Sequence, residues 1–199
     1  MFIFDIMKIA VKKNRKQQIE EKATALFQEK GYAATSMRDL ANVLGIEAAS
    51  LYSHIKSKEE ILQKVCFRMA DEFFAAWQAV EMENSSYAAK LEKAAIAHIK
   101  VTTLDTNASA VFFNEWRHLS DPFLGDFLSM RNDYEGRFIE IIEKGMEAGE
   151  FKNVDSKFMM LTILSSLNWT HNWYKPGGSL SPQEIGKRLV NMILNGLNN

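Results

Sequence analysis

The chain has 199 residues, of which 47% are hydrophobic and one is a cysteine, and its 24 Lys and Arg nearly balance 25 Asp and Glu. This apolar fraction excludes a disordered chain, and a single cysteine excludes a fold held by intramolecular disulfides. No uninterrupted apolar stretch approaches the roughly 20 residues that a helix needs to span a bilayer. We therefore expect a cytoplasmic, globular protein without a membrane partner.

The net charge of −1 hides an uneven distribution of charge along the chain. Residues 1–68 contain 12 Lys and Arg and 8 Asp and Glu, a net charge of +4, whereas residues 69–199 contain 12 and 17, a net charge of −5. The sharpest basic cluster consists of Lys8, Lys12, Lys13, Arg15 and Lys16. A solvated tail would give the same cluster, but a basic head on an acidic body also suits a protein that docks on phosphates.

Residues 1–13 are predicted to form an N-terminal extension. The run from Met1 to Met7 is apolar but short, and the basic residues follow it, which is the wrong order for a signal peptide. Met7 is therefore an alternative native start.

The chain is predicted to be all-helical, because its first 121 residues contain no proline and strand-like alternation is scarce throughout. A first helix carries an apolar stripe from Ile19 to Phe27 and ends at Gly31. A second, short helix begins after Ser36, which can cap it, and ends before Gly45.

A third short helix is predicted at about residues 47–53, and a long fourth helix begins with a capping box formed by Ser57 and Glu60. The later predicted helices span residues 86–104, 107–119, 122–148, 155–174 and 182–197. These elements indicate two modules: a three-helix N-terminal domain over residues 14–60, and a larger helical domain over residues 61–199.

Two short helices joined by a turn that contains glycine form a helix-turn-helix, whose second helix can lie in the major groove of DNA. Residues 37–43, 44–46 and 47–53 supply the first helix, the turn and the second helix, and Gly45 can take the positive φ of the turn. This pattern alone is weak evidence, since many helical hairpins share it.

The residues around the helix-turn-helix extend the pattern. They are Ala23...Leu26-Phe27...Gly31-Tyr32...Thr35-Ser36...Leu40-Ala41...Leu44-Gly45-Ile46...Ser50-Leu51-Tyr52...His54...Ser57-Lys58-Glu59. At these positions, residues 14–66 closely resemble the N-terminal domain of the TetR family of bacterial transcriptional regulators. The resemblance implies a homodimer that binds a double-stranded DNA operator, has no enzymatic activity and needs no cofactor. It also implies that the C-terminal domain binds a small-molecule effector and mediates dimerisation.

The resemblance assigns DNA contacts to eight residues in or beside the helix-turn-helix, which runs from Met37 to Lys56. They are Thr35, Ser36, Ala48, Ala49, Ser50, Tyr52, His54 and Lys58. Hydroxyls and backbone N–H groups at a helix start suit a phosphate, and Lys58 matches the family's phosphate-contacting lysine. The recognition helix departs from the family pattern at Glu47, Ala48 and Ala49. Because it has no Arg, Asn or Gln, base readout would depend on alanine methyl groups, Ser50 and DNA shape.

Aromatic residues concentrate in the C-terminal domain, where most are expected in the core and some around an effector. We assign the effector pocket to Phe112, Trp116, Arg117, Tyr134, Phe138, Trp169 and Trp173. Scattered positions, including Glu115-Trp116-Arg117 and Leu167-Asn168-Trp169, are similar to TetR regulators that sense acyl-coenzyme A (CoA) thioesters. This similarity implies a repressor that leaves its operator when a long-chain acyl-CoA binds, with a CoA phosphate near Arg117, Arg131 or Arg137. Sensing of a hydrophobic drug, with control of an efflux pump, is the alternative.

The last two predicted helices carry broad apolar faces, with Phe158 and Leu161 on one and Ile185 and Met192 on the other. In the family, such helices from two subunits form a four-helix dimer interface. The resemblance therefore implies dimerisation through this part of the chain.

An enzyme is the alternative from another class. Glu115-x-x-His118 matches the ligand motif of di-metal helical bundles, but such sites need a second copy of the motif and two more carboxylates. No other histidine has a glutamate three residues before it, so we expect no metal site. Cys66 lies among apolar residues and is predicted to be buried packing.

Overall fold

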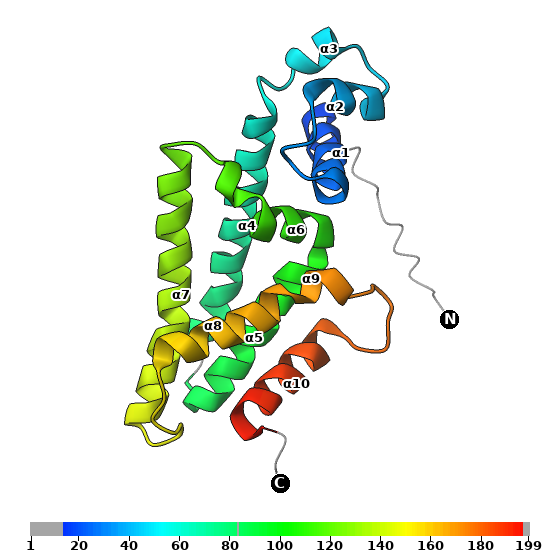
Figure 1. Ribbon diagram of the computed structural model, residues 1–199. Helices are drawn as coiled ribbons and strands as arrows, with labels where there is room; N and C mark the ends of the chain where they lie inside the picture. Colours follow the sequence, from blue (N-terminus) through cyan, green and yellow to red (C-terminus); the bar gives the residue numbers. More distant parts are fainter. Residues whose placement is uncertain (1–13, 83, 197–199) are drawn as a thin grey trace, which may run out of the picture.

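Every regular element is helical in residues 14–82 and 84–196, which the computed structural model describes (Figure 1). The elements are α1 (Arg15–Lys30), α2 (Met37–Leu44), α3 (Ala48–Tyr52), α4 (Lys58–Glu81), α5 (Tyr87–Leu104), α6 (Thr106–Asn114), the 3-10 helix η1 (Trp116–His118), α7 (Phe123–Glu147), α8 (Ser156–Asn168), α9 (Thr170–Trp173) and α10 (Pro182–Asn195). The helices α1, α2 and α3 form a head at one end of the molecule, and α10 lies at the other. The predicted all-α fold with an N-terminal helix-turn-helix is confirmed.

Local capping signals explain where the head helices begin and end. Ser36 caps α2 by accepting a hydrogen bond from the Asp39 N–H, and Gly45 ends it with φ 63° and ψ 37°, the left-handed conformation that glycine adopts without strain. Ser57 caps α4 by accepting a hydrogen bond from the Glu60 N–H, but the reciprocal half of the predicted capping box is absent. The Glu60 carboxylate accepts from the Lys56 N–H at 2.8 Å, which ties the end of the helix-turn-helix to the start of α4.

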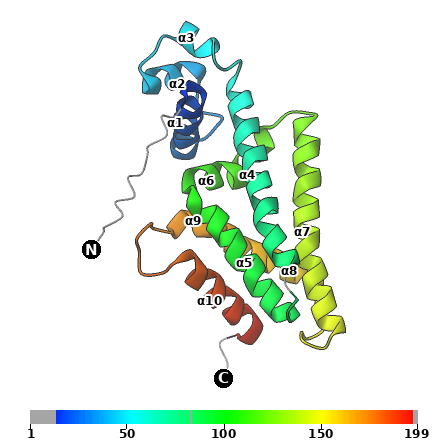
Figure 2. The ribbon, with the colours of Figure 1, turned by 180° about the vertical axis from the view of Figure 1, so that it is seen from behind.

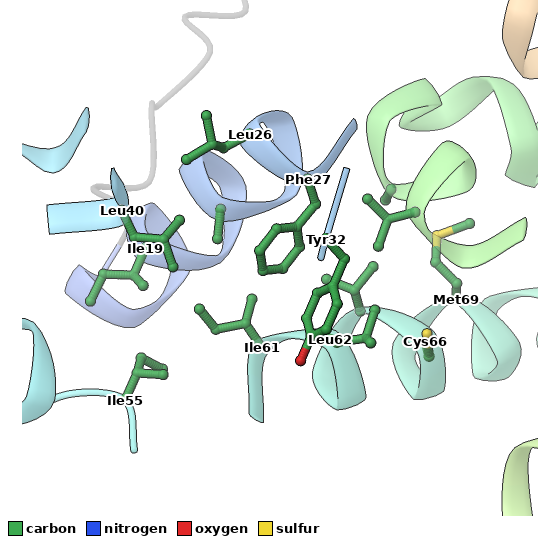
Figure 3. Close-up of a cluster of buried hydrophobic side chains, with 14 of the residues drawn as sticks. Ile19, Leu26, Phe27, Tyr32, Leu40, Ile55, Ile61, Leu62, Cys66 and Met69 are labelled. Atoms are coloured by element: carbon green, nitrogen blue, oxygen red, sulfur yellow. The ribbon is translucent and has the colours of Figure 1, made fainter. Parts of the chain in front are cut away.

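The core of the head continues into the rest of the molecule. Figure 3 shows Ile19, Phe27 and Leu40 of the head packed towards Ile61, Leu62 and other buried side chains of α4. The same cluster extends to Val111 in α6 and Phe127 in α7. The head therefore shares one hydrophobic core with α4, α6 and α7 and packs directly against α4 and α6. The division predicted at residues 60 and 61 stays a prediction, and it falls within the first turn of α4.

Two predicted helices are wrong in extent. The helix predicted at 107–119 ends at Asn114, and residues 116–118 form η1, whose aromatic side chains then pack in different directions. The helix predicted at 155–174 divides at Trp169. There the His171 ring hydrogen-bonds to the Asn168 carbonyl at 2.6 Å, while the Asn172 N–H bonds to the Trp169 carbonyl instead. This competition between side chain and backbone interrupts the α-helical pattern.

The C-terminal domain is built around α5, with α4 and α10 beside it (Figure 2). Gly186 of α10 makes the close approach possible, because a Cβ atom there would lie 2.9 Å from the Cα atom of Ile96 in α5. A second hydrophobic cluster joins α4, α5, α7, α8 and α10. Across residues 14–82 and 84–196, no helix combines the length and the apolar character needed to cross a membrane.

Candidate functional site

Four of the eight predicted DNA-contacting residues surround one hollow in the head surface. Its volume is about 430 Å³. Thr35, Ser36, Tyr52 and Lys58 line it, together with the exposed Lys56. The hollow lies where the turn between α1 and α2 meets the end of the helix-turn-helix, so the fold brings together residues that are up to 23 positions apart in the sequence.

The two hydroxyl residues before α2 are already engaged within the protein. Thr35 is only 1% exposed, and its hydroxyl donates to the Gly31 carbonyl at 2.8 Å. Ser36 is exposed, but its hydroxyl and its N–H both bond to the Asp39 carboxylate. These hydrogen bonds lower the pKa of Asp39, which is therefore ionised beside the hollow. The Thr35 hydroxyl is thus not free for the phosphate contact that the sequence predicts, and the contact of Ser36 stays a prediction.

Lys58 reaches back from α4 and holds the turn between α1 and α2. Its ammonium group donates to the carbonyl oxygens of Tyr32 at 2.8 Å, Thr35 at 2.9 Å and Ala33 at 3.4 Å. It also lies 4.3 Å from the centre of the Tyr32 ring. A lysine has three N–H donors, so in this conformation all of them are used within the protein. The predicted phosphate contact of Lys58 would require it to exchange one of these partners.

The second helix of the motif, α3, presents part of its predicted contact set outwards. Ala49 and Ser50 are exposed, and Tyr52 is 54% exposed. Ala48 is half-buried and packs against the core of the head, so its predicted contact with DNA stays a prediction. His54 is half-buried and follows the end of α3.

A cavity of about 240 Å³ opens in the C-terminal domain and contains four of the seven predicted effector residues. These four are Phe112, Trp116, Arg117 and Tyr134. They come from α6, η1 and α7, which lie beside α4 (Figure 1). The structure therefore brings together predicted effector residues from three separate helices.

The other three predicted effector residues do not line the cavity. Phe138 is fully buried in the second hydrophobic cluster, where its ring lies 4.9 Å from that of Trp77. Trp169 and Trp173 are 63% and 44% exposed, because they lie on the outward face of α8 and α9. One of the three lies in the core and two lie on the surface, so their assignment to the effector site stays a prediction that this cavity does not support.

Several lining residues were missed by the sequence analysis. They are Ala70, Phe73, Phe74, His98, Phe113, Phe127, Met130, Glu135, Leu164 and Asn168. Arg131, suggested from the sequence for a CoA phosphate, also lines the cavity. Most of the missed residues are apolar and show no signal beyond helical periodicity. His98 gives a local signal, because it is a polar residue in the middle of an apolar stretch of α5. It is 2% exposed, and its Nδ1 atom lies 3.1 Å from the Tyr134 hydroxyl.

The solvent-facing side of the cavity carries positive charge. Trp116 has the guanidinium groups of Arg117 and Arg131 at 5.1 and 4.8 Å from its ring. Both arginines are exposed, and Arg131 lies 3.5 Å from Glu135. Arg137, the third arginine suggested for a phosphate, does not line the cavity and instead pairs with Glu81 at 2.6 Å.

The segment at the cavity entrance also contacts the head. The His118 ring stacks on Tyr32, with ring centres 5.1 Å apart and planes 27° apart. Two residues later, the Ser120 N–H donates to Glu59 of α4 at 3.0 Å. The Tyr32 ring in turn lies under Lys58. Residues 116–120 thus touch both the cavity and the side chains that hold the head.

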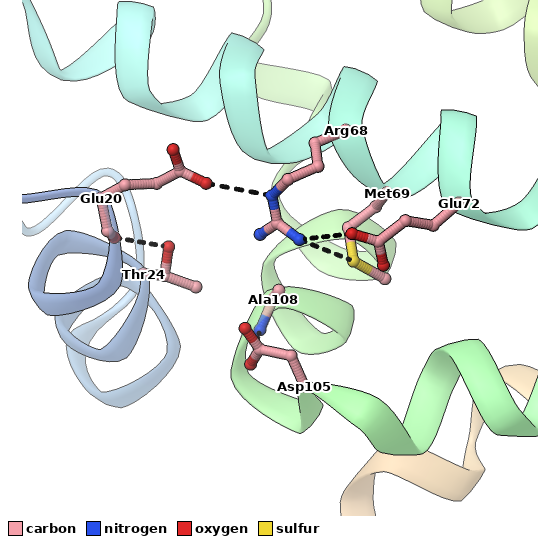
Figure 4. A network of polar contacts seen from close by, with 7 residues as sticks. All are labelled: Glu20, Thr24, Arg68, Met69, Glu72, Asp105 and Ala108. Carbon is pink, nitrogen blue, oxygen red and sulfur yellow. Dashed lines mark hydrogen bonds and ion pairs between the residues drawn. The ribbon is translucent and has the colours of Figure 1, made fainter. Parts of the chain in front are cut away.

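A second polar contact joins the head to α4. Arg68 donates through Nε to Glu20 of α1 at 3.1 Å and through a terminal nitrogen to Glu72 at 2.8 Å (Figure 4). One guanidinium therefore orients α1 against the middle of α4.

The motif that suggested a di-metal enzyme forms a contact of its own. The His118 Nε2 atom lies 3.4 Å from the Glu115 carboxylate. Among the residues that the structure describes, no group of three His, Cys, Asp or Glu side chains is arranged to hold a metal ion. Cys66 is buried as predicted, and its burial raises the pKa of the thiol to about 12.

Comparison with known proteins links the head and the body to one family. A model described as "Bacterial regulatory proteins, tetR family" matches residues 19–65, and one described as "Tetracyclin repressor-like, C-terminal domain" matches residues 84–197. The transcriptional repressor KstR2 of Mycolicibacterium smegmatis is 27% identical over 186 residues, covering 92% of this chain and 91% of that protein.

Solved structures agree with the family models. The TetR family regulator PfmR of Thermus thermophilus is 31% identical with a TM-score of 0.80, over 92% of this chain and all of that chain. AibR, solved with isovaleryl coenzyme A and operator DNA, shares the fold with a TM-score of 0.78 at 23% identity, over 91% of this chain and 98% of that chain. The C-terminal family model alone matches more than half of the chain, and the N-terminal model matches the helix-turn-helix head. The chain therefore belongs to the TetR family of bacterial transcriptional regulators.

Proposed function

We propose that this regulator is a repressor that binds operator DNA as a homodimer and leaves it when a CoA thioester with a compact acyl group enters the cavity. The observation that carries the proposal is the aromatic cavity with two exposed arginines at its solvent-facing side. The relative KstR2 is a transcriptional repressor, and the structure of AibR contains both a CoA thioester and operator DNA. Those properties belong to the relatives and support the proposal for this chain.

The hollow in the head suits a phosphate of the DNA backbone. Lys56 and Tyr52 are exposed beside it and offer an ammonium group and a phenol hydroxyl. The outward residues Ala49 and Ser50 then face the major groove of the DNA, where their short side chains discriminate little between bases. Glu47, exposed at the start of α3, disfavours a close phosphate there and directs backbone contacts towards the hollow.

The charges at the cavity favour an anionic effector over a neutral drug. Arg117 and Arg131 flank Trp116, so a phosphate at the entrance and an apolar group inside are accommodated together. The cavity, at about 240 Å³, is smaller than the roughly 300–1,000 Å³ typical of sites for drug-sized ligands. We therefore narrow the effector from a long-chain acyl-CoA to one with a compact acyl group.

The contacts of residues 116–120 supply a route from the cavity to the head. An acyl-CoA that displaces Trp116 or Arg117 also moves His118, which stacks on Tyr32. Tyr32 and its carbonyl are partners of Lys58, so the turn before α2 shifts with them. Release requires the effector to bind the shifted state more tightly than the DNA-competent state.

The exposed apolar face of α8 and α9 is the proposed dimer surface. Phe158, Leu161, Trp169 and Trp173 are all exposed there, Phe158 to 69%. Successive members of this set are 3, 8 and 4 residues apart, a helical spacing that places them on the same side of the helices. Large apolar side chains gathered on one face are typical of an interface between subunits. Ile185, predicted on the apolar face of the last helix, is buried within the subunit.

Operator release measured by fluorescence anisotropy tests the effector proposal. We expect benzoyl-CoA or isovaleryl-CoA to release the DNA, and Arg131→Gln to raise the effective concentration about tenfold, as expected for the loss of one charge-assisted contact. Lys100→Gln, at an exposed position of α5 outside the cavity, is the matched control. Release by neutral hydrophobic drugs, unchanged in Arg131→Gln, would support the efflux alternative.

Two further variants test the coupling and the dimer. His118→Ala should keep CoA-thioester binding but reduce the release of DNA, because the stack on Tyr32 is removed. Trp169→Asp should give monomers in sedimentation velocity, whereas Met82→Asp, at an 88% exposed position after α4, should not. A wild-type monomer at micromolar concentration would contradict the proposed dimer.

A further inference from the structure

The cavity in the C-terminal domain differs from the core in the kind of side chain that lines it. Seven of its 15 lining residues are Phe, Tyr or Trp, and the aliphatic or thioether side chains among them are Ala70, Met130 and Leu164. Among the buried hydrophobic residues that the structure describes, by contrast, six of 37 are Phe, Tyr or Trp. A void left by imperfect packing of this core would be lined mainly by aliphatic groups. The concentration of rings is therefore a property of the cavity and not of the interior as a whole.

The rings form one continuous wall that starts at the solvent-facing side of the cavity. The ring centre of Trp116 lies 5.8 Å from that of Phe127, which lies 5.4 Å from that of Phe112. The wall continues to Phe73, at 5.3 Å from Phe112, and then to Tyr134, at 5.7 Å from Phe73. These rings come from η1, α7, α6 and α4 (Figure 1). Phe112, Trp116 and Tyr134 are only half-buried, so part of their surface stays uncovered.

A planar aromatic guest suits such a wall. Aromatic rings favour offset-stacked or edge-to-face pairs with centres roughly 4.5–7 Å apart, because the negative face of one ring attracts the positive edge of another. The wall already contains both kinds of pair: the planes of Trp116 and Phe127 are 18° apart, and those of Phe112 and Phe127 are 68° apart. An aromatic group that enters the cavity therefore meets ring faces as well as ring edges. A saturated ring of the same size gains only from burial.

We propose that the acyl group of the effector is aromatic, so that the effector is a one-ring aryl-CoA such as a benzoyl or phenylacetyl thioester. This inference rests on the proposed function, which supplies the CoA thioester and the compact acyl group. Arg117 and Arg131 are exposed and face the CoA phosphates, while the aryl ring lies beyond Trp116, against the wall formed by Phe127 and Phe112. The site thereby distinguishes an aryl group from an alicyclic group with the same number of carbons.

Matched pairs of thioesters test the aromatic preference on the full chain. Titration calorimetry compares benzoyl-CoA with cyclohexanecarbonyl-CoA, and phenylacetyl-CoA with cyclohexylacetyl-CoA. The saturated ring has at least as much apolar surface as the aromatic one, so burial alone predicts that it binds at least as tightly. Each aromatic pair contributes roughly two- to tenfold in affinity beyond burial, and we therefore expect a Kd at least about fivefold lower for the aryl thioester of each pair. A saturated thioester that binds as tightly as its aryl counterpart, in either pair, overturns the inference.

A variant locates the preference at the wall of rings. Phe112→Leu removes a ring from the middle of the wall but keeps an apolar side chain, so the ratio of the two Kd values in each pair should fall at least about twofold. Phe123→Leu is the matched control, because this ring is 38% exposed at the start of α7 and does not line the cavity, and the ratio should be unchanged. An unchanged ratio in folded Phe112→Leu overturns the assignment. If that variant does not fold, the pairs on the wild-type chain decide.

The two levels of proposal fail differently. If the saturated thioesters bind and release operator DNA as well as the aryl ones, the proposed function stands and the aromatic preference is overturned. If no CoA thioester of either pair binds, the proposed function is overturned and the inference falls with it.

Discussion

Replacing Lys58 with methionine tests whether this residue is mainly a structural cation of the head. Methionine keeps most of the side-chain length but removes the ammonium group and its hydrogen bonds to the carbonyls of Tyr32 and Thr35, at 2.8 and 2.9 Å. Hydrogen bonds from charged donors contribute about 1.5–3 kcal/mol each. The contact with the Tyr32 ring contributes about 0.5–1 kcal/mol more.

The expected loss of unfolding free energy is smaller than the sum of these contributions. Lys58 is half-buried, so water replaces part of the missing hydrogen bonding to the carbonyls. We expect Lys58→Met to lower the free energy of unfolding by about 2–4 kcal/mol. For a chain of this length, that corresponds to a fall in Tm of several degrees. Urea unfolding followed by circular dichroism measures the difference directly.

Lys56→Met is the matched control, because Lys56 is exposed and lies beside the same hollow. We expect it to leave stability unchanged but to lower the slope of log K against log salt by about 0.9 for each DNA phosphate that is no longer neutralised. Lys58→Met should do the reverse: lower stability, with an unchanged slope. If Lys58→Met is as stable as the wild type and lowers the slope, the structural role is refuted, and Lys58 is the phosphate contact that the sequence predicts.

Three further predictions follow from burial and close packing. Burial keeps His98 neutral in the folded state, with its pKa lowered to about 3, so as the pH falls the unfolded state binds a proton that the folded state does not. Between about pH 6.5 and 3 the wild type should therefore lose up to about 1.4 kcal/mol of unfolding free energy per pH unit relative to His98→Gln. Urea unfolding that gives both proteins the same pH dependence of stability would contradict this. Gly186→Ala should cost about 1–3 kcal/mol in urea unfolding, because the new Cβ meets the backbone of Ile96, whereas Gly136→Ala, with no atom within 4 Å, should stabilise slightly. Cys66, with its pKa raised to about 12, should resist iodoacetamide at about pH 8 until urea is added, and rapid alkylation of the folded protein would count against its burial.

The head was predictable from the sequence because its boundaries are local. Gly31, Gly45 and Ser57 act through their own backbone conformation or through a hydrogen bond three residues away. The divisions at Glu115 and Trp169 have no glycine or proline to mark them. They depend on contacts such as the His118 stack on Tyr32, between residues 86 positions apart. Periodicity alone gives no sign of such contacts.

The cavity was only partly predictable for a similar reason. Aromatic residues at helical spacing indicate an apolar face, but not whether that face meets the core, a cavity or another subunit. Phe138, Trp169 and Phe112 illustrate the three cases: core, surface and cavity. His98 lies between apolar neighbours in α5, and its contact with Tyr134 appears only when α5 and α7 are packed together. Whether an aromatic side chain lies in the core, at the surface or in the cavity is decided by how the helices pack together.

If a CoA thioester releases the repressor, as proposed, the energy required for release indicates which part of that effector is essential. Changing a two-state population from 1:99 to 99:1 takes about 5.5 kcal/mol of differential binding. The cavity of about 240 Å³ has room for about eight water-sized groups of roughly 30 Å³. At about 0.8 kcal/mol for each buried CH₂, these contribute about 6 kcal/mol, and all of it would have to favour the released state.

Part of that burial energy is common to both states. Under the proposed function the acyl group alone therefore falls short, and contacts of the CoA phosphates with Arg117 and Arg131 are expected to supply the remainder. A pantetheine thioester of the same acid, which lacks the nucleotide phosphates, should therefore bind but release less than half of the operator at saturation, as measured by anisotropy. Full release by the pantetheine thioester would show that the acyl group drives the transition without the arginines.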